Sequence, residues 1–419
     1  MAIFHATVPH MLRMPPTDLP DADRMLVVLS DIEMGSGGPE DDFPHSDALG
    51  ELILRYNEPP FDEMAIDLVF NGDTFDLLKT DYNGDYPRHV SEPIAMAKLA
   101  RITAAHPRFF EALKLFGAHQ RAERWIHFIT GNHDAELCFP AVQHKIRRAC
   151  GEDAPLSFAG LSLDVGRVRI EHGSQLDNLF RVDPERPLVT YKDQQVLNIS
   201  WGSAVLLDTV MPLKALLAFY DRLKPRGYPF VLMPEMRELL MARLWTYWTR
   251  DYWKGLFFAG DPTKKLSWTI VKEVVARLAT QDVEVAPRPV YQERLRTDDF
   301  YLLYVLGHQH DAGWWSFGDR KLLQSGCLRN EYMLSPDGHR MRPIPKSYIE
   351  VYLREGLPVV SHLVELEFPE PPPGYIPESI FDVLPRVREL LGSAAERNRR
   401  REAQRELEVR GGSGSNHSD

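Results

Sequence analysis

Cysteine is scarce in this chain. Three cysteines occur among 419 residues, and they form neither a Cys-x-x-Cys pair nor an even-numbered set. This scarcity excludes a framework of disulfide bonds, which small secreted domains use in place of a large core. Unpaired cysteines are typical of a reducing compartment, so we predict a cytoplasmic location.

Long apolar runs are also missing. The N-terminal residues lack a basic stretch followed by an apolar one, so they do not predict a signal peptide. The most apolar stretch, residues 204–220, is interrupted by Asp208, Pro212 and Lys214 and is short for a membrane span. We therefore expect no transmembrane segment and interpret this stretch as a buried or interfacial helix, which leaves peripheral contact with a membrane open.

An excess of positive charge is absent as well. The formal net charge is -11 and the isoelectric point is about 5.8. Because nucleic-acid phosphates repel an acidic surface, nucleic acid is not an expected partner without a local basic patch. Apolar residues make up 44% of the chain, an ordinary share, and the length allows a large core in two or three structural units. The sequence leaves the oligomeric state open.

Short apolar runs that end in polar residues recur along the chain. Five of them predict buried strands, at residues 25–30, 66–71, 125–130, 168–171 and 300–306. Acidic, amide or imidazole side chains follow each run, and helical patterns such as residues 95–113 and 142–150 fill the gaps. Ligands of α/β folds bind outside the carboxyl ends of the strands, so we expect these side chains to form one site.

The pattern changes in the second half of the chain. Residues 201–258 carry large apolar and aromatic residues at helical spacing, broken by four prolines, which predicts an inserted helical subdomain. Runs at residues 321–326, 348–353 and 359–368 alternate like edge strands. The expected organisation is a lead-in at 1–24, a core at 25–180 and 300–370, a helical cap inserted at 181–299, and a C-terminal helix with a disordered tail at 371–419.

Seven side chains at the predicted strand ends are capable of binding metal ions. They are Asp31, Glu33, Asp73, Asn132, His172, His308 and His310. Hard divalent metals need clustered oxygen and imidazole ligands, and a pair of metals needs one ligand that bridges them. Any one of these residues alone is more often a cap or a loop residue, but seven together make a metal site the better interpretation.

The order of these segments resembles the calcineurin-like metallophosphoesterase superfamily. The family pattern runs D-x-H, GDxxD, GNH[DE], H and GHxH, and this chain carries Asp31-Ile32-Glu33, Gly72-Asp73-Thr74-Phe75-Asp76, Gly131-Asn132-His133-Asp134, His172 and Gly307-His308-Gln309-His310. The resemblance spans about residues 25–180 and 300–330 and leaves the insertion and the tail uncovered. It implies an α/β fold, a four-layer αββα sandwich, that carries a two-metal hydrolase of phosphate esters or anhydrides.

The resemblance also implies a role for each residue. The metal ligands would form two sets around a shared carboxylate: Asp31, Glu33 and His310 for one metal, Asn132, His172 and His308 for the other, and Asp73 between them. Such metals lie roughly 3.5–4 Å apart, and a hydroxide that bridges them would be the nucleophile. His133 would protonate the leaving oxygen or stabilise the transition state, and Asp76 would orient it.

Glu33 departs from the family pattern, which usually has histidine at that position. Glutamate can still ligate a metal, but it replaces a neutral ligand with an anionic and harder one. It therefore favours Mn²⁺ or Mg²⁺ over Zn²⁺. We expect two divalent ions, manganese by preference, with Mg²⁺, Fe²⁺ and Zn²⁺ as alternatives. A weakened or lost first metal site is the other interpretation of Glu33.

The residues after Asp76 narrow the substrate class. Phosphoprotein phosphatases of this superfamily carry an arginine directly after that aspartate, whereas Leu77 and Leu78 follow here, which disfavours protein phosphatase activity. The GDTFD and GNHD segments are similar to those of bacterial UDP-2,3-diacylglucosamine hydrolases, in which a helical insertion receives acyl chains. The resemblance thus implies a phosphorylated small-molecule or lipid-linked substrate.

A binding scaffold is the alternative to an enzyme. In that interpretation the chain keeps a phosphoesterase fold with reduced turnover and uses the insertion and the tail as contact surfaces. A scaffold has no need of a group that protonates a leaving oxygen. The presence of His133 together with Asp76 therefore favours the enzyme.

Overall fold

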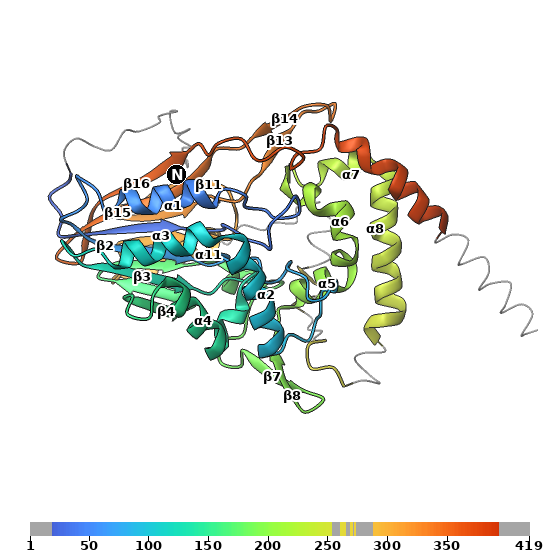
Figure 1. The fold of residues 1–419 in the computed structure, drawn as a ribbon, viewed down its shortest axis with the longest axis horizontal. Helices are drawn as coiled ribbons and strands as arrows, with labels where there is room; N and C mark the ends of the chain where they lie inside the picture. Colours follow the sequence, from blue (N-terminus) through green and yellow to red (C-terminus); the bar gives the residue numbers. More distant parts are fainter. Residues whose placement is uncertain (1–18, 254–259, 265–268, 271, 274–287, 394–419) are drawn as a thin grey trace, which may run out of the picture.

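The larger of two central sheets has six strands and a parallel centre (Figure 1). The computed structural model describes residues 19–253, 260–264, 269–270, 272–273 and 288–393. The strands lie in the order β16 (Leu357–Leu366), β15 (Lys346–Arg354), β1 (Arg24–Leu29), β2 (Ala65–Asn71), β3 (Arg124–Ile129) and β4 (Leu156–Gly160). β1 to β4 run parallel, and the antiparallel pair β15 and β16 extends the sheet beyond β1. The carboxyl ends of β1, β2 and β3 therefore meet at one edge of the sheet.

The smaller sheet has five strands and packs face to face against the larger one. Its order is β11 (Ala312–Phe317), β12 (Arg320–Ser325), β10 (Leu303–Leu306), β6 (Val168–Glu171) and β5 (Ser162–Val165). β12, β10 and β6 are parallel. Aliphatic side chains of both sheets form the layer between them, among them Leu26, Val69, Ile170 and Val305. This dry layer brings the segments that follow β6 and β10 next to those that follow β1, β2 and β3.

Helices cover the outer faces of both sheets. Those on the larger sheet are α1 (Ser46–Arg55), α2 (Glu92–Ala105), α3 (Pro107–Gly117) and α4 (Pro140–Cys150), with the 3₁₀ turn η1 (Ala135–Cys138). Their apolar sides join the largest hydrophobic cluster. On the smaller sheet lies α11 (Arg288–Thr297), whose Leu295 packs against Tyr304 and Leu322. The protein is thus an αββα sandwich of the α/β class, as predicted.

Three of the predicted elements are wrong in detail. The sequence predicts one helix over residues 95–113, but two form, because His106 leaves the helical conformation and Pro107 begins α3 without an N–H to donate. The runs predicted as edge strands at residues 321–326 and 348–353 lie inside the sheets. β12 stands between β11 and β10, and β15 stands between β16 and β1. β15 is buried over nearly its whole length, so its pattern does not reveal an exposed face.

The chain between β6 and β10 forms a second, largely helical unit beside the sandwich (Figure 1). Its elements are η2 (Ser174–Leu176), the hairpin β7 (Leu188–Tyr191) and β8 (Gln194–Leu197), α5 (Trp201–Thr209), η3 (Met211–Leu213), α6 (Lys214–Leu217), η4 (Ala218–Arg222), α7 (Tyr228–Leu232), α8 (Pro234–Thr246) and a π-helical turn (Tyr247–Tyr252). A small sheet of β14 (Met341–Pro343), β13 (Tyr332–Leu334) and β9 (Leu223–Lys224) ties it to the chain after β12. The end of the predicted helical pattern, residues 254–258, lies outside the described residues.

The C-terminal helical segment packs against this helical unit, while Tyr375 before it donates to the carbonyl oxygen of Asp41 in the loop after β1. The turn η6 (Ile380–Val383) starts with a capping box made by Ser379 and Asp382, and residues 384–393 continue as a helix. Ile380 and Val387 are buried in the core of the helical unit, beside Met236 of α8. The predicted disordered tail and most of the predicted lead-in lie outside the described residues. The domain boundaries stay predictions.

One helical stretch among the described residues, Trp201–Arg222, is long and apolar enough to cross a membrane by length and composition. Its mean hydropathy is 1.5, and 44% of its most apolar window is buried inside the protein. Pro212 and the turn η3 divide this stretch, and Leu207, Met211 and Leu217 are buried. Core helices of soluble proteins pass the same test, so the described part of the chain shows no clear membrane span.

Candidate metal centre

Five of the predicted ligands have a left-handed backbone conformation. They are Asp31, Glu33, Asp73, His308 and His310, with φ between 50° and 71°. Such a conformation is uncommon outside glycine and costs about 1–3 kcal/mol for each residue. The other four such residues in the described chain, Asn83, Lys192, Asp193 and Glu355, lie in turns. Backbone strain in one cluster of polar residues indicates a functional site.

Glycines beside these residues permit the close approach of the segments. A Cβ atom on Gly131 would lie 2.1 Å from Asp73 Oδ1, and one on Gly307 would lie 2.0 Å from Ser30 Oγ and 2.7 Å from Asp31 Oδ2. Real Cβ atoms essentially never show any of these three distances. The glycines that precede Asn132 and His308 are therefore required for the loops to converge on Asp31 and Asp73.

Asn132 and His172 present unpaired acceptor atoms on one side of Asp73. Nδ1 of His172 lies 2.9 Å from the carbonyl oxygen of Asn71, so Nδ1 carries the proton and Nε2 carries a lone pair. In the neutral ring that Nε2 is an acceptor that faces another acceptor, Asp73 Oδ2, at 3.1 Å, and the buried Oδ1 of Asn132 has no partner. Buried acceptors are nearly always satisfied. These residues and His308 therefore fit a cation, which we call the second metal position.

A proton is the competitor of a metal at this position. Burial lowers the pKa of His172, but the charges of Asp73 and Asp31 outweigh it and raise that pKa to about 10. The imidazole is then protonated at neutral pH when no metal is bound. Metal binding requires the neutral ring and must displace that proton.

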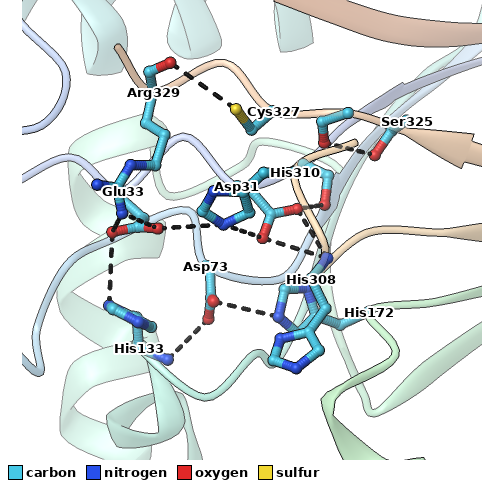
Figure 2. Close-up of polar contacts among 12 residues, drawn as sticks. Asp31, Glu33, Asp73, His133, His172, His308, His310, Ser325, Cys327 and Arg329 are labelled. Atoms are coloured by element: carbon cyan, nitrogen blue, oxygen red, sulfur yellow. Dashed lines mark hydrogen bonds and ion pairs between the residues drawn. The ribbon is translucent and has the colours of Figure 1, made fainter. Parts of the chain in front are cut away.

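The first metal position lies on the other side of Asp73. Nε2 of His310 is 3.5 Å from both Asp31 Oδ1 and Glu33 Oε1. Ligands at about 2.1 Å from one octahedral ion lie roughly 3 Å apart, so His310 Nε2 is close enough to each of these two oxygens to share a cation with it. Figure 2 shows Asp31, Glu33 and His310 on one side of Asp73, and His172 and His308 on the other. The residues present thus fit two metals, and their ligand roles stay predictions.

Each predicted histidine ligand has an acceptor at its far nitrogen. Nδ1 of His310 lies 2.7 Å from Glu331 Oε1, and Nε2 of His308 lies 3.5 Å from Asp177 Oδ2, while His172 uses the carbonyl of Asn71. Such acceptors fix the ring orientation and the tautomer of metal-binding histidines. Sequence analysis missed Glu331 and Asp177. The only feature of the sequence that could have indicated one of them is that Asp177 follows soon after His172 along the chain.

Glu33 has partners that the sequence did not reveal. Nη1 of Arg329 donates to both carboxylate oxygens at 2.8 Å, and Nζ of Lys79 donates to Oε2 at 2.7 Å. Burial alone would raise the pKa of Glu33, but the charges of Arg329 and Lys79 hold that pKa well below its usual range. The extra negative charge expected from this glutamate is therefore compensated within the site.

His133 and Asp76 form the predicted pair. Nδ1 of His133 lies 2.9 Å from Asp76 Oδ1, and the backbone N–H of His133 donates to Asp73 Oδ1. Burial lowers the pKa of His133, but Glu33 and Asp73 outweigh it and raise the pKa to about 9. The imidazole therefore carries a proton at neutral pH when no metal is bound, and Asp76 holds its orientation.

The site opens into a cavity of about 370 Å³. Six of the nine predicted site residues line it, and Asp31, Asp76 and His172 lie behind them. The other wall comes from the helical unit and is mainly apolar, formed by Phe180, Trp201, Val205, Leu206, Val210, Met211, Leu217 and Leu244. The cavity therefore joins a polar end at the two metal positions to an apolar wall.

No protein-family model and no curated protein matches the chain. Solved structures with a similar fold include an archaeal phosphodiesterase, at 9% identity, with 82% of this chain and 99% of that chain covered and a TM-score of 0.29. A dimetal phosphatase from Danio rerio has 11% identity, coverages of 83% and 100%, and a TM-score of 0.32. Vacuolar Protein Sorting 29 from Cryptosporidium parvum has 11% identity, coverages of 84% and 100%, and a TM-score of 0.28. Likenesses this distant do not decide function, so the assignment depends on the site.

Proposed function

We propose that this chain is a metallophosphoesterase of the calcineurin-like superfamily, a hydrolase that holds two divalent metals. The observation that carries the proposal is the buried Oδ1 of Asn132, an acceptor without a partner at the position where His172 Nε2 meets Asp73. Buried acceptors without a donor are costly unless a cation satisfies them. The strained backbone of the other ligands supports the same assignment.

The protein's own residues have distinct tasks in this reaction. Asp31, Glu33 and His310 would hold one metal, and Asn132, His172 and His308 the other, with Asp73 shared. Bound metals would neutralise phosphoryl oxygens and lower the pKa of water. His133, held by Asp76, lines the cavity and would give a proton to the leaving oxygen. The bond cleaved is a phosphodiester, a phosphomonoester or a pyrophosphate.

The metal and the substrate follow from the chemistry of the two ends of the cavity. Carboxylates of Asp31, Glu33 and Asp73 at the first position suit hard cations, so we favour Mn²⁺, with Mg²⁺, Fe²⁺ and Zn²⁺ as alternatives. The apolar wall fits a phosphorylated small molecule or lipid-linked substrate with an apolar part. Three free cysteines among the described residues agree with the proposed cytoplasmic location.

Hydrolysis of bis-p-nitrophenyl phosphate tests the proposal. Protein stripped of metal should be inactive and should regain turnover with Mn²⁺. His172→Ala, which removes a predicted ligand of the second metal, should lower turnover by at least about 100-fold. His144→Ala is the matched control, because His144 is an exposed residue of α4. Full turnover without metal, or equal turnover of both variants, would refute the proposed function.

A binding scaffold is the second candidate, because the helical unit exposes large apolar side chains. Val231, Met241 and Trp245 are 63%, 53% and 71% exposed. Exposed apolar groups of this size are typical of contact surfaces. A scaffold predicts metal binding without turnover on any phosphodiester, so the same assay separates the two candidates.

A further inference from the structure

Glu33 belongs to a cluster of charges whose other members have no part in the proposed reaction, and all of them except Asp221 are buried. The cluster consists of three carboxylates and three cations, namely Glu33, Asp42, Asp221, Lys79, Arg222 and Arg329. Both Lys79 and Arg329 contact all three carboxylates, while Arg222 pairs with Asp42 at 2.7 Å. Arg329 is 1% exposed, so its charge depends on these partners rather than on water.

The contacts give the two oxygens of Glu33 different surroundings. Oε2 accepts from Lys79 at 2.7 Å and from Arg329 at 2.8 Å. Oε1 accepts from Arg329 at 2.8 Å and lies 3.5 Å from His310 Nε2. Lys79 thus occupies the far oxygen, and Oε1 is the oxygen that faces the first metal position.

The charges of the cluster balance. Its three carboxylates face three cations, and Asp76 and Arg226 add one further charge of each sign at 3.4 Å from Lys79 and 3.5 Å from Asp221. The usual ligand at the position of Glu33 is a neutral imidazole. Arg329 and Lys79 offset the negative charge of Glu33. Glu33 can therefore offer the metal a ligand oxygen without adding net negative charge to the site, as a neutral histidine would.

We propose that Arg329 and Lys79 are positioning residues for the first metal, and that they make Glu33 a usable substitute for histidine. They hold Oε1 toward the metal position and cancel the charge of the carboxylate. This inference rests on the proposed function. Its consequence is that Glu33 and Arg329 are exchangeable only as a pair, because either change alone leaves the six-residue cluster with one charge in excess.

A double-mutant cycle tests the pair, with Glu33→His, Arg329→Met and the two combined. After loading with Mn²⁺, each single variant should bind its first-position ion at least about 10-fold more weakly than the wild type. In EDTA each should also unfold at a Tm lower by about 5 °C or more. The combined variant should recover both metal affinity and Tm, since imidazole replaces carboxylate and the surplus cation is gone.

Arg388→Met is the matched control, because Arg388 pairs with Glu235 at 2.8 Å on the exposed surface of the helical unit. Combined with Glu33→His, it should restore neither affinity nor Tm. Additive losses in the Glu33→His and Arg329→Met cycle, with two ions in the wild type, would overturn this inference alone. Fewer than two ions in the wild type would overturn the proposed function and, with it, the ligand role of Glu33.

Discussion

The two metal positions differ in how their ligands are paired before a metal binds. The second position offers an amide and two imidazoles, and the buried Oδ1 of the amide, Asn132, has no partner. The first position offers two carboxylates, and the added one, Glu33, is already paired with Arg329 and Lys79. An unpaired neutral acceptor is satisfied when a cation or a hydrogen-bond donor reaches it. A compensated carboxylate is satisfied before the metal arrives.

This difference indicates what stabilises each position. The second position depends on its ion, because Asn132 Oδ1 stays unpaired without one. The first position depends on its neighbours, because the cluster around Glu33 is balanced by protein charges. Removal of metal should therefore disturb the second position more than the first.

Asp73→Ala should lower turnover and metal binding more than any other variant. Asp73 lies between the two positions, so its loss removes a ligand from both. We expect turnover to fall by at least about 10³-fold and both ions to bind poorly, since neither keeps its full set of ligands. Metal analysis together with phosphodiesterase assay measures this. A variant that keeps two ions and normal turnover would refute a shared carboxylate.

His133→Ala should lower turnover by about 10²–10⁴-fold while both ions remain bound. His133 contacts Asp76 and lines the cavity, but it is not in either ligand set. The loss should be smaller on a p-nitrophenyl ester than on an alkyl ester, because a good leaving group needs little protonation. Equal losses on both esters would exclude the proton-donating role and leave a positioning role.

Glu331→Gln and Asp177→Asn should each weaken metal affinity at a different position. Glu331 holds Nδ1 of His310 and Asp177 lies near Nε2 of His308, so each acts on the histidine of one position. Loss of such a partner usually weakens metal affinity by about 10–100-fold. Calorimetric titration should show a weaker affinity for the first ion in Glu331→Gln. It should show a weaker affinity for the second ion in Asp177→Asn. An identical change at both ions in either variant would contradict the separation.

Metal affinity at the second position should rise with pH. In the metal-free fold the pKa of His172 is about 10, above the ordinary value of 6.5, so the ring binds a proton that the metal must displace. The affinity should therefore increase by about tenfold per pH unit between pH 7 and 9, with release of a proton on binding. The same protonated ring stabilises the metal-free fold below pH 6.5, and that stabilisation is lost as the pH rises through about 10. A pH-independent affinity would show that His172 is already neutral.

Apolar strands that end in polar residues are the part of this molecule that its sequence predicts well. Parallel strands buried on both faces produce continuous apolar runs, and their carboxyl ends meet at one edge, so Asp31, Asp73 and Asn132 could be placed together. The break between α2 and α3 is a local signal at Pro107 that the helical period of residues 95–113 obscures.

The partners of the ligands could not be predicted in the same way. Arg329 is 296 residues from Glu33 along the chain, and only the packing of the two sheets brings them into contact. The surplus of carboxylates at the first position, with Glu33 beside Asp31 and Asp73, indicates that a cation is needed. It does not indicate which lysine or arginine supplies it, because that depends on tertiary contacts.

Anomalous diffraction from crystals grown with Mn²⁺ tests the two-metal site most directly. We predict two peaks on opposite sides of Asp73, one bordered by Glu33 and His310 and the other by Asn132 and His172. A single peak beside Asn132 and His172 would contradict the two-metal site and would leave Glu33 as a partner of Arg329 and Lys79 alone.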